Sequence, residues 1–309
     1  MISTIEEALR TGWLSKIAAR ARLPWRKEQE PELAPMTGSL EGRVGFALGT
    51  GRCGTHFIAK LMEHEPEVAS IHERDPLLQA FHRYCKWYEL PIDDEGFLQT
   101  TEAQIRRDLA RRRFSFESSP TLAMSVTELD QRFAAKFVFL IRHPRDVVKS
   151  YLHKGWYESP MVQQRPELAL GYQAGRKFQH FLGRIAPRGD EFAPWNRLTR
   201  VGKLAWYWSA LNRAVMAKAK AIPGERWRMY LLEDFDFAKY REVAAYFGFT
   251  PQLTAQKFDE IRHARPGAQK NIPPAAWTEQ EWSEFEHHAK PLADELGYKI
   301  DRKATKRPT

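Results

Sequence analysis

The sequence predicts an α/β domain built on a parallel sheet of roughly five strands, because short apolar runs alternate with helical patterns along most of the chain. The first apolar run, residues 44–48, leads into a glycine-rich turn and then a helix. The clearest buried run, residues 136–141, is likewise followed by a helix start at Pro144. Ligands of such sheets bind at the carboxyl ends of the strands, so these two turns are candidate site segments.

Length and composition suit a single domain of about 250 residues with extensions, since 309 residues can bury a full core. The net charge of +9 favours an anionic partner, without separating nucleotides from acidic glycans, nucleic acid or anionic lipid. Two cysteines are too few for a disulfide framework and fit a reducing compartment. No apolar run has membrane-spanning length and no signal peptide is evident, so we expect a cytoplasmic protein.

Three segments are expected: an N-terminal arm with a linker over 1–41, the α/β domain over 42–300, and a basic tail over 301–309. The arm is an amphipathic helix over residues 1–22, with apolar side chains on one face and arginines and a lysine elsewhere. Such a helix docks on its own domain or on a partner subunit, or lies on an anionic membrane surface as a peripheral contact. A homo-oligomer is compatible with the first of these arrangements.

The remaining elements follow in order. Further strands are predicted over 68–71, 114–117 and 227–232, and helices over 101–113, through much of 151–226, up to about Gly248, and after a loop over 263–277. The last helix begins with a capping box formed by Thr278 and Glu281. Aromatic residues between Trp156 and Trp208 either pack in the core or line a substrate pocket.

The first turn contains Gly49, Gly51 and Gly54. Glycines allow the backbone N–H groups to point inward, and the helix that follows adds its unpaired N–H groups and the positive end of its dipole. A phosphate or sulfate suits this turn. A turn that joins strand to helix without any ligand is the alternative.

Two kinds of phosphate chemistry are disfavoured at this turn. A nucleoside-triphosphate loop needs Lys and then Ser or Thr after its last glycine, whereas Thr55 and His56 stand there. A cysteine phosphatase built on Cys53 would need an arginine about six residues later. Position 59 is Ala.

A second candidate segment follows residues 136–141. Arg142 sits at the strand end, Pro144 suits the first helical position, and Ser150 lies about two turns along the helix. A forked cation and a hydroxyl suit a phosphate dianion. A structural ion pair is the alternative for this segment taken alone.

Together the two segments resemble the PAPS-dependent sulfotransferase family. In that family a [KR]-x-G-T-T loop binds the 5′-phosphosulfate of 3′-phosphoadenosine 5′-phosphosulfate (PAPS), and an R-x-P-x-D segment with a Ser eight residues after the Arg binds the 3′-phosphate. This chain has Arg52-Cys53-Gly54-Thr55-His56, and then Arg142, Pro144, Asp146 and Ser150. The resemblance extends from about Gly42 to Tyr298.

The resemblance implies a role for each matching residue. Arg52 occupies the catalytic basic position, and Glu73, which lies 21 residues further on, matches the general base of tyrosylprotein-type members. His72 and Glu117 are the other candidate bases. His56 replaces the second Thr and could contact the sulfonate. The implied donor-binding residues are Gly51, Arg52, Cys53, Gly54, Thr55, His56, Phe57 beside adenine, Arg142, Ser150, Arg265 and Gly267.

The reaction implied is transfer of a sulfuryl group from PAPS to a hydroxyl or amine, without a metal. The acceptor is expected to be a small molecule, a carbohydrate or glycoconjugate, or a lipid-linked compound. No motif supports nucleic-acid binding. A nucleotide kinase or other P-loop phosphotransferase and a non-catalytic nucleotide-binding module are the alternatives.

Overall fold

The computed structural model describes residues 36–158, 182–264 and 277–302. Residues 35–309 belong to one compact unit. The predicted N-terminal helix, Arg265, Gly267 and most of the basic tail lie outside the described residues, so they stay predictions.

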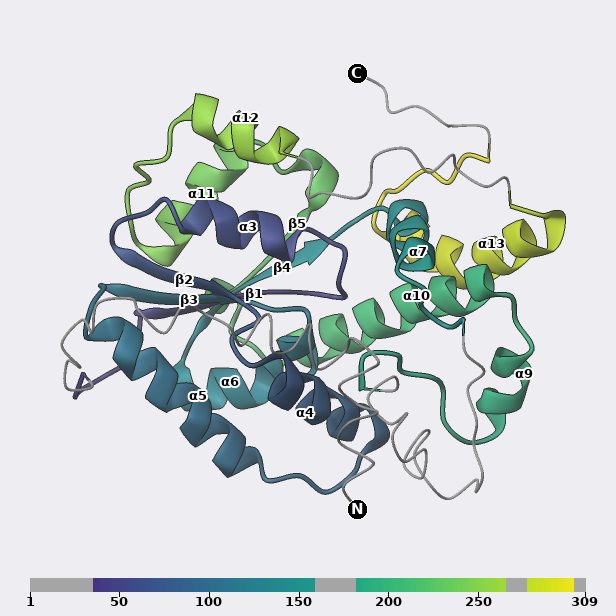
Figure 1. The fold of residues 1–309 in the computed structure, drawn as a ribbon, viewed down its shortest axis with the longest axis horizontal. Helices are drawn as coiled ribbons and strands as arrows, with labels where there is room; N and C mark the ends of the chain where they lie inside the picture. The colour runs from purple at the N-terminus through teal and green to yellow at the C-terminus, as the bar shows by residue number, and fades with distance from the viewer. Residues whose placement is uncertain (1–35, 159–181, 265–276, 303–309) are drawn as a thin grey trace, which may run out of the picture. The chain divides into compact units, whose positions relative to one another are not determined.

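The centre of the fold is a five-stranded, all-parallel sheet (Figure 1). Its strands are β1 (Val44–Gly49), β2 (Val68–His72), β3 (Phe114–Ser118), β4 (Lys136–Ile141) and β5 (Trp227–Leu231). The order across the sheet is β2-β3-β1-β4-β5. The fold class and the five predicted strands are therefore confirmed, with each strand end within one residue of its predicted position.

Helices cover both faces of this sheet, which explains why the central strands β1 and β4 are apolar and buried over almost their whole length. The helices of the described residues are α3 (Thr55–Met62), α4 (Pro76–Tyr88), α5 (Asp94–Leu109), α6 (Val126–Phe133), α7 (Pro144–His153), α9 (Phe192–Asn196), α10 (Arg200–Ala219), α11 (Phe237–Phe247), α12 (Ala255–His263) and α13 (Glu279–Glu295). In Figure 1, α3, α11 and α12 lie on one side of the sheet, and α4, α5 and α6 on the other. Alternate side chains of β1 follow this division, because Phe46 and Leu48 join the cluster that contains α4 and α10, while Ala47 joins the cluster of α3 and α11.

Two predicted helical stretches differ from the structure. The helix predicted over 101–113 begins earlier, at Asp94, because the Asp93 carboxylate caps it by accepting from Gly96 N–H at 2.9 Å, and it ends at Leu109. The prediction of helix over much of 151–226 is confirmed, among the described residues, only for α7, α9 and α10. Residues 183–191 contain no α-helix, since Pro187 and Gly189 interrupt the helical pattern.

Other helix ends are as predicted. Pro144 is the first residue of α7, and Gly248, in the left-handed conformation, ends α11. The capping box of α13 is present, with Thr278 and Glu281 bonded reciprocally. α4, which leads away from the end of β2, had no counterpart in the prediction.

The sheet order places the topological switch point at the end of β1. The chain leaves β1 through α3 towards β2, beyond β3, whereas β4 and β5 lie on the other side of β1. Ligands of open α/β sheets bind outside the carboxyl ends of the strands at such a point. The glycine-rich turn lies there.

Candidate functional site

The turn between β1 and α3, residues 50–54, has the conformation of an anion-binding loop. Gly51, Arg52 and Gly54 all have positive φ, at 88°, 58° and 102°. A β-carbon on Gly51 would collide with the Tyr151 hydroxyl, so only glycine fits there. Gly54 is the N-cap of α3 and provides no side-chain hydrogen bond, which leaves the first N–H groups of the helix available to an anion.

Two buried tyrosines hold this loop in place from behind. The Thr50 carbonyl accepts hydrogen bonds from the hydroxyls of Tyr151, at 2.8 Å, and Tyr207, at 3.0 Å. Burial raises the pKa of Tyr151 well above its usual value, so this phenol remains a hydrogen-bond donor. The loop is thereby fixed to α7 and α10. No sequence pattern pointed to either tyrosine, because their roles depend on contacts between distant segments.

The two predicted anion-binding segments meet at Arg52. Its Nε donates to the Ser150 hydroxyl at 2.7 Å, and its carbonyl accepts from Nη1 of Arg142 at 3.2 Å. The contact from Arg142 supports the left-handed backbone of Arg52, which costs free energy in a residue other than glycine. Arg52, Arg142 and Ser150 therefore lie together at the ends of β1 and β4.

Local structure positions Arg142 at this point. His143 caps α7, its Nδ1 accepting from Arg145 N–H at 3.2 Å, so Arg142 falls between the end of β4 and the helix. The carbonyl of Arg142 accepts from Trp208 Nε1 at 3.0 Å, and the Arg142 guanidinium lies 3.4 Å from the Asp146 carboxylate. Nε of Arg142 is buried and has no hydrogen-bond partner among the described residues. No described residue therefore satisfies this donor of the guanidinium.

Cys53 is fully buried in the loop, and burial raises the pKa of its thiol. The thiol is therefore neutral and closed to solvent, which fits a small packing residue whose backbone faces the anion. Phe57, one turn into α3, is half-buried and makes edge contacts with Phe235 and Phe258. Its predicted stacking on adenine stays a prediction.

The candidate bases His72 and Glu73 lie where β2 ends, beside the loop. His72 Nε2 is 3.3 Å from the Thr55 hydroxyl, its Nδ1 is 3.7 Å from the Glu73 carboxylate, and the exposed His56 ring stands edge-on to it at 5.2 Å. Burial lowers the pKa of His72 to about 4, and the positive charges of His56 and Arg52 act in the same direction. His72 is therefore neutral near pH 7, and the tautomer with its proton on Nδ1 can donate towards the Glu73 carboxylate. Glu73 itself has a left-handed backbone, with φ at 52°, and its side chain is one-third exposed.

Glu117, the third candidate base, is occupied by structural contacts. It is only 2% exposed and accepts from Arg74 N–H at 2.9 Å, Arg74 Nε at 3.3 Å and Gln79 Nε2 at 2.6 Å. Arg74 in turn contacts Asp108 at 2.6 Å. A carboxylate that is buried and bonded in this way is poorly placed to receive a proton from a substrate. Neither the sequence nor the resemblance indicated this network.

Most of the described aromatic residues between positions 156 and 208 pack in the core. Tyr207 and Trp208 are completely buried, and Tyr157 and Trp195 nearly so. Trp206 is different, since it is half-buried and, with Trp87 of α4, lines a surface pocket. Among the described residues, no group of three or more His, Cys, Asp or Glu side chains could hold a metal ion, and no helix is long and apolar enough to span a bilayer.

Comparisons with known proteins identify the fold. No protein-family model and no curated protein matches the chain. The sulfotransferase STF9 from Mycobacterium avium superposes with a TM-score of 0.51 at 12% identity, over 85% of this chain and 79% of that one. A sulfotransferase from Alicyclobacillus acidocaldarius gives a TM-score of 0.45 at 15% identity, over 86% and 98% of the two chains. At these identities the Mycobacterium structure establishes the fold alone, and that fold is the sulfotransferase fold.

Proposed function

We propose that this protein is a sulfotransferase that moves the sulfuryl group of PAPS to a hydroxyl or amine of an acceptor. The observation that carries the proposal is the meeting of Arg52, Arg142 and Ser150 at the ends of β1 and β4. A donor with a phosphosulfate and a separate 3′-phosphate needs two anion sites side by side. Here the segments that resemble those two sites in sequence are in contact, although they are about 90 residues apart.

The chemistry follows from the position of each group. The acceptor oxygen or nitrogen attacks sulfur, the bond from sulfur to the bridging 5′-phosphate oxygen breaks, and the electron pair stays on that oxygen. Arg52 and the N–H groups of the loop would stabilise this negative charge, which is a matter of position rather than of covalent chemistry. To do so the Arg52 guanidinium must exchange its contact with Ser150 for the donor.

Glu73 would accept the proton that the acceptor loses. It lies beside the loop and is partly open to solvent, so an acceptor can reach it. Neutral His72, between Glu73 and Thr55, would orient the carboxylate through its Nδ1. General-base catalysis of this kind contributes about 10²- to 10⁴-fold in rate. Arg265 and Gly267 keep their proposed part in holding the 3′-phosphate, and His56 its proposed contact with the sulfonate.

A carbohydrate or glycoconjugate hydroxyl is the acceptor that we propose, with lipid-linked and small natural-product hydroxyls to be compared with it. The chain's positive charge of +9 suits acidic members of this class.

The donor is tested by calorimetric titration with 3′-phosphoadenosine 5′-phosphate, the product of the reaction. We expect micromolar or tighter binding of this bisphosphate and none of ATP with Mg²⁺. Arg142→Ala should weaken it by about 10- to 100-fold, the worth of a charge-assisted hydrogen bond. Arg113→Ala, at an arginine 67% exposed and paired with Glu67, is the matched control. Preference for ATP, or equal affinity of the Arg142→Ala variant for the bisphosphate, would contradict the proposal. The loop would then belong to a nucleotide kinase or have a structural role alone.

The reaction is tested with ³⁵S-labelled PAPS and a panel of sugars, lipids and phenols. Glu73→Gln should keep the affinity for the bisphosphate while losing roughly 10²-fold or more in transfer to any acceptor that the wild-type protein sulfates. A variant with full transfer activity would exclude Glu73 as the base. Bisphosphate binding without transfer to any compound in the panel would favour a non-catalytic nucleotide-binding module.

A further inference from the structure

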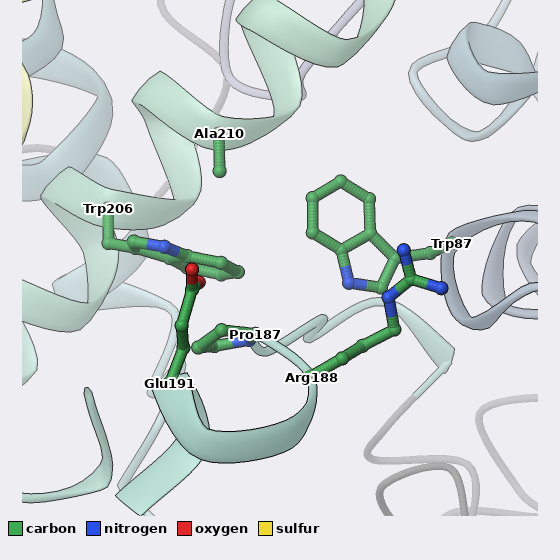
Figure 2. Close-up of a pocket in the computed structure, with 6 residues that line it drawn as sticks. All are labelled: Trp87, Pro187, Arg188, Glu191, Trp206 and Ala210. Atoms are coloured by element: carbon green, nitrogen blue, oxygen red, sulfur yellow. The ribbon is translucent and has the colours of Figure 1, made fainter. Parts of the chain in front are cut away.

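A pocket of about 390 Å³ lies at the far end of α4 from the candidate active site. Trp87, Pro187, Arg188, Glu191, Trp206 and Ala210 line it (Figure 2). Trp87 is the penultimate residue of α4, and Trp206 and Ala210 lie one turn apart on α10. The remaining lining residues, Pro187, Arg188 and Glu191, belong to the segment that precedes α9. α4 spans 13 residues, so roughly 18 Å of helix separates Trp87 from the loop that holds Glu73.

The two indole rings form rigid, perpendicular walls. Their centroids are 6.0 Å apart and their planes meet at 87°. The Trp87 ring is fixed because its Nε1 donates to the Ala186 carbonyl at 2.8 Å, and the Trp206 ring is fixed by an edge contact with Trp195 at 5.5 Å. A cation is attracted by the face of a tryptophan when it lies within about 6 Å of the ring centroid. One bound cation can satisfy this condition for both rings.

The lining of the pocket carries one charge of each sign, and the positive one is already paired. Arg188 is matched by Glu89, which it contacts through two nitrogens at 2.8 and 2.7 Å. Glu191 is exposed, forms no ion pair with any residue that the structure describes, and its carboxylate points towards the Trp206 ring (Figure 2). The carboxylate of Glu191 therefore favours a positively charged ligand.

We infer that this pocket binds an organic cation, of the class of quaternary or methylated ammonium groups. The indole faces would contact the methyl groups and the positive charge, and Glu191 would supply the opposing charge without a covalent step. A sugar ring could stack on the same indoles, but it would leave the Glu191 charge unmatched. The inference does not rest on the proposed sulfuryl transfer, because no residue of the pocket belongs to the anion loop or to the segment from Arg142 to Ser150.

The inference is tested by calorimetric titration of the full chain with choline and with 3,3-dimethyl-1-butanol, its neutral isostere of the same shape. We expect saturable binding of choline, at least about tenfold tighter than that of the alcohol. Glu191→Gln should weaken the binding of choline by fivefold or more. Asp190→Asn is the matched control, since it removes the same charge from the neighbouring residue, which does not line the pocket, and should change the affinity by less than twofold.

Equal affinity for choline and the alcohol, no binding of choline, or an unchanged affinity in Glu191→Gln would each overturn the inference. Tighter binding of methyl glucoside than of choline would replace it by a sugar site. The titration is repeated with Arg142→Ala, in which choline binding should be unchanged. If the proposed donor site is wrong, the titration with 3′-phosphoadenosine 5′-phosphate will show it, and the result with choline will not change.

Discussion

Arginines lie at the ends of two neighbouring pairs of strands in this sheet, and they are neutralised differently. At the ends of β2 and β3, Arg74 is only 10% exposed and is held by the carboxylates of Glu117 and Asp108. At the ends of β1 and β4, Arg52 contacts a hydroxyl, Ser150, and no carboxylate of the described residues. Arg142, beside it, contacts a single carboxylate of the described residues, that of Asp146 at 3.4 Å.

The difference separates a structural arginine from one suited to a ligand. A buried guanidinium bonded to two carboxylates has no charge left for an incoming anion, and removing it would leave those carboxylates buried and unpaired. Guanidinium groups that meet hydroxyl and carbonyl oxygens keep a positive field at the ends of β1 and β4. The comparison therefore predicts that substitutions on the β2–β3 side change stability, whereas substitutions on the β1–β4 side change affinity for anions.

The largest expected effect is that of Arg74→Met on stability. This substitution leaves the buried Glu117 without its cation, which should lower the free energy of unfolding by about 3–5 kcal/mol. Urea denaturation measures the change, and Arg113→Met, at an exposed ion pair, should cost less than about 1 kcal/mol. The comparison would break if Arg74→Met had little effect on unfolding but abolished the binding of 3′-phosphoadenosine 5′-phosphate.

His72 ends β2 and contacts Thr55 of α3, and its titration gives the next effect. Burial first, and then His56 and Arg52, lower its pKa from 6.5 to about 4 in the folded protein. Between these two pH values the unfolded chain binds more protons at this residue, so the free energy of unfolding falls as the pH falls. From pH 7 to pH 4 the wild-type protein should lose about 2 kcal/mol more than His72→Gln does, which allows for the side chain being 24% exposed.

The measurement is urea denaturation of both proteins at several pH values. Arg52→Ala should reduce the wild-type dependence on pH, because it removes one of the positive charges that lower the pKa of His72. An identical pH dependence in wild type and His72→Gln would mean that His72 is as easily protonated in the folded protein as in the unfolded one.

The sequence was sufficient to predict the parts of the fold and site that depend on local patterns. Each strand is a short apolar run, and the turn at Gly51 and Gly54 needs glycine for its backbone, so both are visible in the sequence. The capping box at Thr278 is also a local pattern. The positions of Arg52 and Arg142 followed from strand ends that a parallel sheet brings to one edge.

The parts that could not be predicted depend on contacts between distant segments. The Tyr207 hydroxyl donates to the Thr50 carbonyl although the two residues are 157 positions apart, and no periodic pattern in the sequence predicts such a hydrogen bond. Glu117 looked like a candidate base until the structure showed Arg74 and Gln79 bonded to it. The aromatic run was ambiguous for the same reason, since Trp206 and Trp208 differ in exposure only because of what packs against α10.

The smallest expected effect, and the most specific, is that of Ser150→Ala. Its hydroxyl accepts from Arg52 and, under the proposed function, would bond to the 3′-phosphate once the Arg52 guanidinium has moved to the 5′-phosphosulfate. One such hydrogen bond contributes about 0.5–1.5 kcal/mol, so the Kd of 3′-phosphoadenosine 5′-phosphate should rise about 3- to 10-fold. Adenosine 5′-phosphate lacks the 3′-phosphate, and calorimetry should show its affinity unchanged or slightly increased, because the substitution also frees Arg52. An equal loss of affinity for both nucleotides would place Ser150 in the support of the loop rather than in contact with the 3′-phosphate, and the β1–β4 side would then have one anion site instead of two.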